Sequence, residues 1–266
     1  MRHSQWLPLL ALCAGCGQKV DHPDLAPECD PGSEDCDTYR PPQSGSPGGG
    51  NEGGAGSSDP EGATVSGQVL VYSDDFFDEG PAFTGQADVS AMGPGGSRVE
   101  DRYDGSVFEL AEVLKASDNW FMVEPDSGEG MMPTITAVDT RIAKSDGYAI
   151  GLASELTVDN LFVLLGSERS PLLANLVVTV VDQQGRSIAG VQAQLAAEVT
   201  AYREAGGWVT SDVGTDDSGM LFFGNAQATA ALSKVTIVFS GAVSARVEAR
   251  AKAGAVTILT AVVSPP

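Results

Sequence analysis

The amino-acid sequence predicts a mainly β protein: two small Greek-key β-sandwich modules joined by a short helix, preceded by a signal peptide and a disordered tether. Three observations predict this class. Apolar and polar residues alternate with period two through much of the chain from Thr64 onward, which is the pattern of half-buried strands. The same order of strands and turns occurs twice. A run rich in Gly, Ser and Pro precedes the first strand.

The first 15 residues have the composition of a secretory signal peptide. Arg2 supplies the positive charge, residues 6–14 supply the apolar segment, and Ala14 and Gly15 are the small residues that a signal peptidase requires. A helix needs about 20 apolar residues to cross a bilayer, so this segment is too short to span one.

Residues 16–63 are predicted to be a tether, acidic at first and then rich in Gly, Ser and Pro. Between positions 41 and 60, 15 of 20 residues are Gly, Ser or Pro, so no large apolar side chain offsets the entropy cost of ordering this segment. Cys29 and Cys36 flank a Pro-Gly turn, and we expect them to form a disulfide outside the cytoplasm. Free thiols are the alternative. We expect the acidic residues around them to form a solvated run. A calcium loop is the alternative, but their spacing does not fit a known loop pattern.

Module 1 is predicted over residues 64–140 and module 2 over residues 175–266. In module 1, alternation indicates strands at 65–71 and 84–89. In module 2, residues 191–199 and 243–249 each place their odd-numbered apolar residues on one face. Residues 235–239 feed the second of these strands through a hairpin-sized loop at 240–242, and residues 255–263 form the closing strand.

The repeat supports two modules of one fold. Each copy has an alternating strand, a turn with Asp and Gly, and an apolar strand, at 84–89, 104–105 and 120–123 in the first copy. The corresponding segments of the second copy are 189–195, 217–219 and 235–238. Two modules of the same architecture explain this order most simply.

The connector, residues 141–174, is predicted to contain the short helix. Val158, Leu161, Phe162 and Leu165 recur at helical spacing, and Gly166 stands where a helix C-cap is expected. A strand at 161–165 is the alternative, because the apolar run is short enough for either.

Composition excludes several classes of function. The chain has 36 Asp and Glu against 15 Lys and Arg, a net charge of −21, which repels nucleic acid backbones. From residue 37 onward there is neither His nor Cys. Zinc sites of Cys and His, Ser-His-Asp triads and thiol nucleophiles are therefore excluded from the predicted modules. We predict that the chain is not an enzyme and has no cofactor.

Two groups of residues are weak candidates for a site. Asp74, Asp75 and Asp78 can supply carboxylates to a metal or to glycoside hydrolysis, but their spacing fits no ligand pattern, which favours a solvated acidic loop. Tyr202 and Trp208 can stack on a sugar ring. Trp208 follows Gly206 and Gly207 and is expected to be exposed in a loop. A carbohydrate-binding module and, less readily, a carboxylate-based glycoside hydrolase are therefore alternatives to a structural or interaction module.

The sequence Ala14-Gly15-Cys16 resembles the lipobox of bacterial lipoproteins. The resemblance implies cleavage before Cys16, lipidation of its thiol and acylation of the new N-terminus. It therefore implies a protein held in the cell envelope outside the cytoplasm, most simply at the outer membrane. An envelope protein or a glycan is the partner that we expect there. Cys13 stands where this family usually has Leu. An ordinary signal peptide with a freely secreted product is the alternative.

Module 2 resembles the carboxypeptidase regulatory-like family in two segments. They are residues 178–191, which look like the opening hairpin of the family, and residues 215–222, which look like its turn before an apolar strand. The resemblance implies a prealbumin-like β-sandwich and a structural or binding role without activity of its own. The long stretch 201–211 departs from the family and is expected to widen a loop. The chain as a whole is similar to secreted lipoproteins of myxobacteria.

We predict that Cys16 carries the lipid. Cells expressing the protein should incorporate labelled palmitate into it, and Cys16→Ser should abolish the label and release the protein from the membrane, because acyl chains supply about 0.8 kcal/mol per buried methylene. A Cys13→Ser variant is the matched control and should remain labelled. Membrane retention of Cys16→Ser would refute the assignment.

Overall fold

The structure is a computed structural model that describes residues 62–264, except for 73–76, 94–95, 117, 142–143, 145–146, 206 and 212. The predicted signal peptide, Cys16, the pair Cys29 and Cys36, and nearly all of the predicted tether lie outside the described residues. None of the helical structure in the described part is both long enough and apolar enough to cross a membrane.

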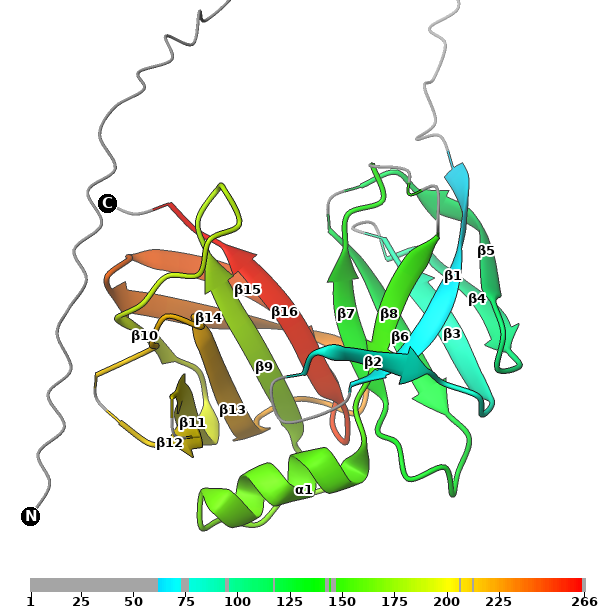
Figure 1. The fold of residues 1–266 in the computed structure, drawn as a ribbon. Coiled ribbons are helices and arrows are strands. Elements are labelled where there is room, and N and C mark those ends of the chain that lie inside the picture. The colour runs from blue at the N-terminus through cyan, green and yellow to red at the C-terminus, as the bar shows by residue number, and fades with distance from the viewer. Residues whose placement is uncertain are drawn as a thin grey trace, which may run out of the picture. The chain divides into compact units, whose positions relative to one another are not determined.

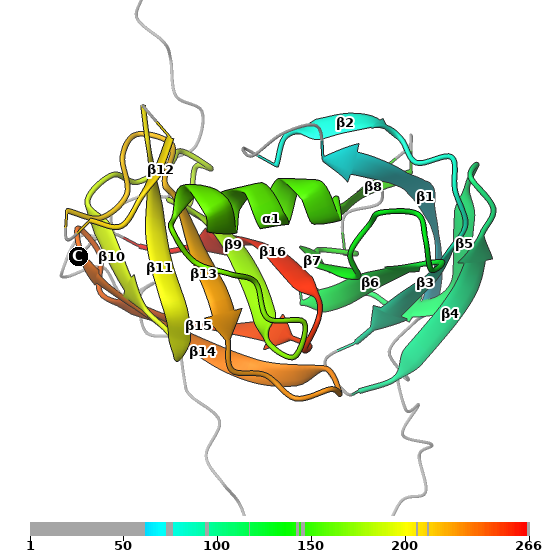
Figure 2. The same cartoon turned by 90° about the horizontal axis from the view of Figure 1, so that it is seen from below.

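The first half of the described chain contains eight strands. They are β1 (Gly62–Tyr72), β2 (Glu79–Ala82), β3 (Ala87–Met92), β4 (Arg98–Tyr103), β5 (Phe108–Leu114), β6 (Asn119–Pro125), β7 (Thr134–Val138) and β8 (Tyr148–Leu152). One layer has the order β2-β1-β5, with β8 parallel to β1, and the facing layer has the order β7-β6-β3-β4. Figure 2 shows the two layers around their core. Val65 and Val69 of β1 are buried in that core, as the alternation predicts.

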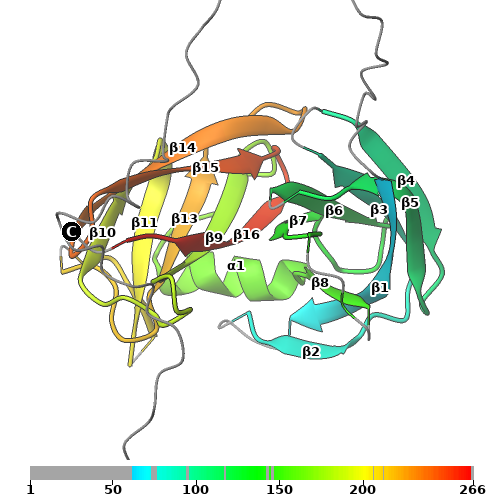
Figure 3. The same cartoon turned by 90° about the horizontal axis from the view of Figure 1, so that it is seen from above.

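The second half adds eight further strands. They are β9 (Ala174–Val181), β10 (Val191–Gln194), β11 (Ala197–Glu204), β12 (Gly207–Val209), β13 (Met220–Ala226), β14 (Ser233–Gly241), β15 (Ala245–Ala251) and β16 (Val256–Val262). The sheet β10-β14-β15 packs on the strands β12-β11-β13-β9-β16 (Figure 3). Leu176, Leu221, Phe223 and Ile237 are fully buried between these layers.

Strand β16 joins the two halves. It pairs in parallel with β9 on one side and with β7 on the other, so one sheet of nine strands, β12-β11-β13-β9-β16-β7-β6-β3-β4, runs through both (Figure 1). The predicted mainly β fold with sandwich modules joined by a short helix is confirmed. The shared sheet is a feature that the sequence pattern did not indicate.

The predicted helix is α1 (Glu155–Leu164), so the alternative strand at 161–165 is wrong. Ser154 caps its N-terminus by accepting a hydrogen bond from the backbone N–H of Thr157, and Gly166 ends it with φ +68°. Phe162 packs edge-to-face on Phe222 at 5.7 Å between ring centroids. The helix therefore covers the face of the nine-stranded sheet that points away from β14 and β15.

The two alternating runs of module 2 have different outcomes. Residues 243–249 behave as predicted, with Val243 and Ala249 buried and Arg246 exposed on the hairpin of β14 and β15. Residues 191–199 form two strands, and not one, since the chain leaves β10 after Gln194 and enters β11 in the other sheet at Ala197. The alternation of burial continues through the break, but the buried residues enter two cores: Val191 and Ala193 lie in the core between the two sheets, and Val199 lies in the core beneath α1.

Candidate functional site

The predicted site residues are only partly described. Cys16, Cys29, Cys36, Asp74 and Asp75 lie outside the described residues. Asp78 is described and exposed. In the part of the chain with described coordinates, no three or more His, Cys, Asp or Glu residues are grouped so that they could hold a metal ion.

The stretch 201–211 is largely a β-hairpin and not the wide loop that the sequence predicts. Strands β11 and β12 pair with Arg203 opposite Trp208, and Gly207, at φ +132°, starts the returning strand. Trp208 is only 5% exposed, and its ring packs edge-to-face on Phe222 at 6.1 Å, with the Arg203 guanidinium 6.0 Å from the ring centroid. The expectation that Trp208 is exposed is therefore wrong. The hairpin of β11 and β12 turns the indole into the core beneath α1.

Tyr202 points to the opposite face of β11, toward the sheet of β10, β14 and β15. Its ring is buried, and its hydroxyl accepts a hydrogen bond from the backbone N–H of Ala193 at 3.1 Å. Thr215 bonds Val191 of β10 twice, through its hydroxyl and its backbone N–H. These contacts occupy backbone groups on the outer edge of β10, which protects that edge strand from pairing with another chain.

A polar groove lies above Tyr202, where the two sheets of the second half open toward solvent. Its volume is about 470 Å³. Besides Tyr202 and Ala193, its lining is neutral and polar: Gln192 and Gln194 of β10, Thr200 of β11, Thr210 and Ser211 after β12, and Ser240 of β14. Both sheets contribute to it, so packing of the sandwich fixes the spacing of its walls.

The chemistry of this groove is that of neutral hydrogen bonding. Amide side chains both donate and accept, and so do hydroxyl groups, so the lining complements ligands rich in hydroxyl or amide groups. Among the described residues that line it there is no carboxylate, imidazole, thiol or amine. The sequence did not identify this set. Its only signal was that Gln192 and Gln194 occupy the outward positions of an alternating run.

Carboxylates do line a second pocket of about 220 Å³, which Asp118 and Trp120 of the first half share with Lys234, Glu248 and Arg250 of the second. Glu248 there pairs with Lys234, with 2.7 Å between Nζ and Oε2. That hydrogen bond lowers the pKa of Glu248 and keeps the carboxylate ionised. A general acid needs the opposite shift, so Glu248 is not suited to be the proton donor of a glycoside hydrolase.

The same direction holds for every described carboxyl group whose pKa is displaced from its ordinary value. In each, hydrogen bonds to the ionised form lower the pKa. The groups are Asp104 beside Ser106, Asp126 beside Arg102, Asp139 beside Arg141, Asp182 beside Arg186, and Glu248 beside Lys234. These acids behave as structural partners in turns and ion pairs.

Comparison with known proteins gives little further information. No family model matches the chain, and no curated protein matches it. The Bacillus anthracis TIE protein is similar with a TM-score of 0.22 and 15% identity over 76% of this chain, which spans 34% of the length of that protein. A Streptococcal ancillary pilin is similar with a TM-score of 0.23 and 11% identity, over 75% of this chain and 68% of the pilin. At these TM-scores no property is transferred from either protein to this chain.

We predict that Tyr202→Phe weakens the wall of the groove without unfolding the protein. The variant leaves the buried N–H of Ala193 without its acceptor, which should lower the free energy of unfolding by about 1 kcal/mol. Denaturant unfolding of the full chain measures this loss, and amide exchange should become faster at Ala193. Gln194→Ala, an exposed change in the same groove, is the control for stability. Unchanged exchange at Ala193 in Tyr202→Phe would contradict the assigned role.

Proposed function

We propose that this chain is a non-enzymatic recognition module of the cell envelope that binds a neutral, hydroxyl-rich ligand, a glycan chain, in the polar groove. The observation that carries the proposal is the lining of that groove, in which amides and hydroxyls from β10, β11, β14 and the segment after β12 converge around about 470 Å³. Glycans present hydroxyl groups that donate and accept in the same way, and they carry no charge that the groove would have to neutralise.

The position of the groove suits recognition. Its side chains stand on strands of two sheets whose shared core contains fully buried Leu221, Phe223 and Ile237, so ligand contacts are made by a rigid scaffold. The hydrogen bond from Ala193 to Tyr202 and the contacts of Thr215 hold β10 in place from its outer side. A ligand therefore meets donors and acceptors that are already oriented, which reduces the entropy cost of binding.

Anchoring completes the proposal. The lipobox-like Cys16 would tether the recognition module to a membrane outside the cytoplasm, and the acidic body would stay clear of nucleic acid. Binding without catalysis fits the described carboxylates, because those with displaced pKa values are held ionised by partners and none of them lines the groove.

The proposal is tested with the soluble full chain carrying Cys16→Ser, applied to an array of neutral oligosaccharides and followed by calorimetry on the best binder. Gln192→Ala with Gln194→Ala should weaken binding by about tenfold or more, corresponding to about 1.4 kcal/mol. Gln68→Ala removes an exposed amide from β1 in the other half and should leave affinity unchanged. Failure of every neutral oligosaccharide to bind, or equal affinity of the groove variant and the wild type, would refute the groove as a glycan site.

The same samples test the non-enzymatic part. Bound oligosaccharides should be recovered intact after prolonged incubation with the protein. Cleavage that disappears in Glu248→Gln would instead identify the charged pocket of Asp118 and Glu248 as a catalytic site.

A further inference from the structure

A third pocket, remote from the polar groove in the fold, is lined by three basic residues. It has a volume of about 240 Å³ and lies in the first half, at the start of β1. Lys115 follows β5, and Arg141 and Lys144 lie between β7 and β8. The remaining lining residues are Ala63, Thr64, Val65 and Ser66 of β1, Thr140, and Tyr148 of β8.

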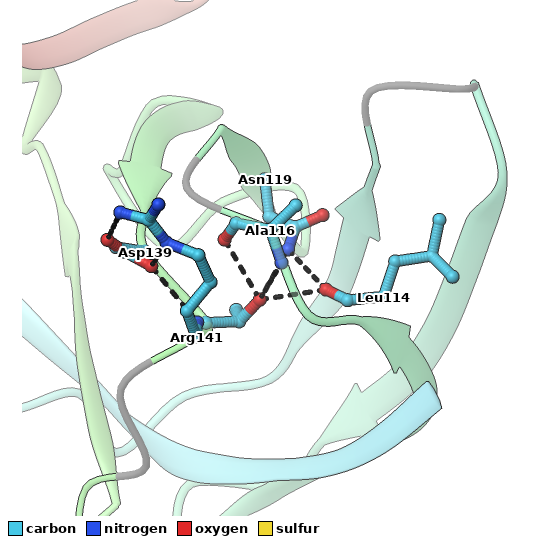
Figure 4. A network of polar contacts seen from close by, with 6 residues as sticks. Leu114, Ala116, Asn119, Asp139 and Arg141 are labelled. Atoms are coloured by element: carbon cyan, nitrogen blue, oxygen red, sulfur yellow. Dashed lines mark hydrogen bonds and ion pairs between the residues drawn. The ribbon is translucent and has the colours of Figure 1, made fainter. Parts of the chain in front are cut away.

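A buried polar network fixes the two segments that carry Lys115 and Arg141 (Figure 4). The hydroxyl of Thr140 accepts hydrogen bonds from Asn119 Nδ2 at 2.6 Å and from the backbone N–H of Ala116 at 3.1 Å, and it donates to the carbonyl of Leu114 at 2.8 Å. The backbone N–H of Thr140 also bonds the carbonyl of Ala116 at 2.9 Å. Lys115 lies between two of these bonded residues, and Arg141 follows Thr140. The hydrogen bonds therefore fix the backbone positions of both basic residues.

The side chains of Arg141 and Lys144 also have contacts that hold them. Asp139 binds Arg141 through two atoms, with 3.0 Å between Nε and Oδ1 and 2.6 Å between Nη2 and Oδ2 (Figure 4). This pairing lowers the pKa of Asp139, so the clamp is present at neutral pH. The Nζ of Lys144 lies 5.6 Å from the centre of the Tyr148 ring, within the range of a cation–π contact. Positioned cations lose less entropy when they bind an anion.

The positive charge of this pocket contrasts with the negative net charge of residues 62–266 as a whole. Residues 62–266 contain 12 Lys and Arg against 26 Asp and Glu, yet three of the 12 line this one pocket. No acid is among the described residues that line it. Asp139 pairs with Arg141 beside it, and Asp118 acts on Arg141 more weakly. A concave site of one sign concentrates the field, and therefore attracts counter-ions even on a protein of opposite net charge.

We propose that this pocket is an oxyanion site that takes a phosphate group. Lys115 and Lys144 supply charge, and Arg141 retains N–H donors at Nη1 for a phosphate oxygen while Asp139 occupies Nε and Nη2. The group belongs either to a soluble phosphate compound or to the head group of an anionic lipid. The second source rests on the proposed lipidation of Cys16, which would tether the chain to a membrane.

The first arm of the test is calorimetric titration of the full chain carrying Cys16→Ser with inorganic phosphate and with pyrophosphate at low salt. Lys115→Gln with Lys144→Gln should weaken binding by about tenfold or more, since each cation contributes a charge-assisted contact. Lys234→Gln with Arg246→Gln removes the same charge from β14 and β15 and should bind as the wild type does. Thermal unfolding of both double variants checks that each remains folded.

The second arm distinguishes the source of the phosphate. The same proteins are sedimented with vesicles of phosphatidylcholine alone and with phosphatidylglycerol added. Binding to phosphatidylglycerol vesicles without binding of free phosphate assigns a lipid head group, and binding of free phosphate or pyrophosphate without vesicle binding assigns a soluble compound. Binding in both arms supports the oxyanion site with either source. No binding in either arm, or binding that the pocket variant and the control variant reduce equally, would overturn the proposal. None of these outcomes tests glycan binding in the polar groove, which is measured separately.

Discussion

The parallel pairing of β16 with β9 and β7 is the contact on which the rest of the described structure depends. Thr257 of β16 lies beside Leu176 of β9 and Ile135 of β7, so β16 pairs with a strand of each half. Val256 and Thr257 are fully buried, and the Thr257 hydroxyl is satisfied by the carbonyl of Arg250 at 2.6 Å. Without β16, both neighbours would become unpaired edges and two apolar cores would open to water.

The nine-stranded sheet positions the residues of both proposed sites. In the second half, β9 aligns β13 and β13 aligns β11, so the wall of the groove that contains Thr200 and Tyr202 is positioned through β16. In the first half, β7 aligns β6, and Asn119 at the start of β6 bonds Thr140 just after β7. The two proposed sites, one neutral and one cationic, are thereby held on one scaffold, each built from side chains that the core keeps in place.

Sequence periodicity predicted what depends on local pattern. It identified the helix through Val158, Leu161 and Phe162, and the buried face of residues 243–249, because solvent exposure of neighbouring residues follows the geometry of one element. It did not predict which strands pair, since β16 and β7 meet from distant parts of the chain. For the same reason it misplaced Trp208, and it gave no sign that the isolated basic residues Lys115, Arg141 and Lys144 share a pocket.

Scanning calorimetry of the full chain carrying Cys16→Ser tests most directly whether β16 makes the two halves one structural unit. Coupling through β16 predicts a single endotherm whose calorimetric enthalpy equals its van't Hoff enthalpy, because unfolding of either half breaks the nine-stranded sheet that both share. Two separate endotherms, each belonging to one half of the chain, would contradict the account.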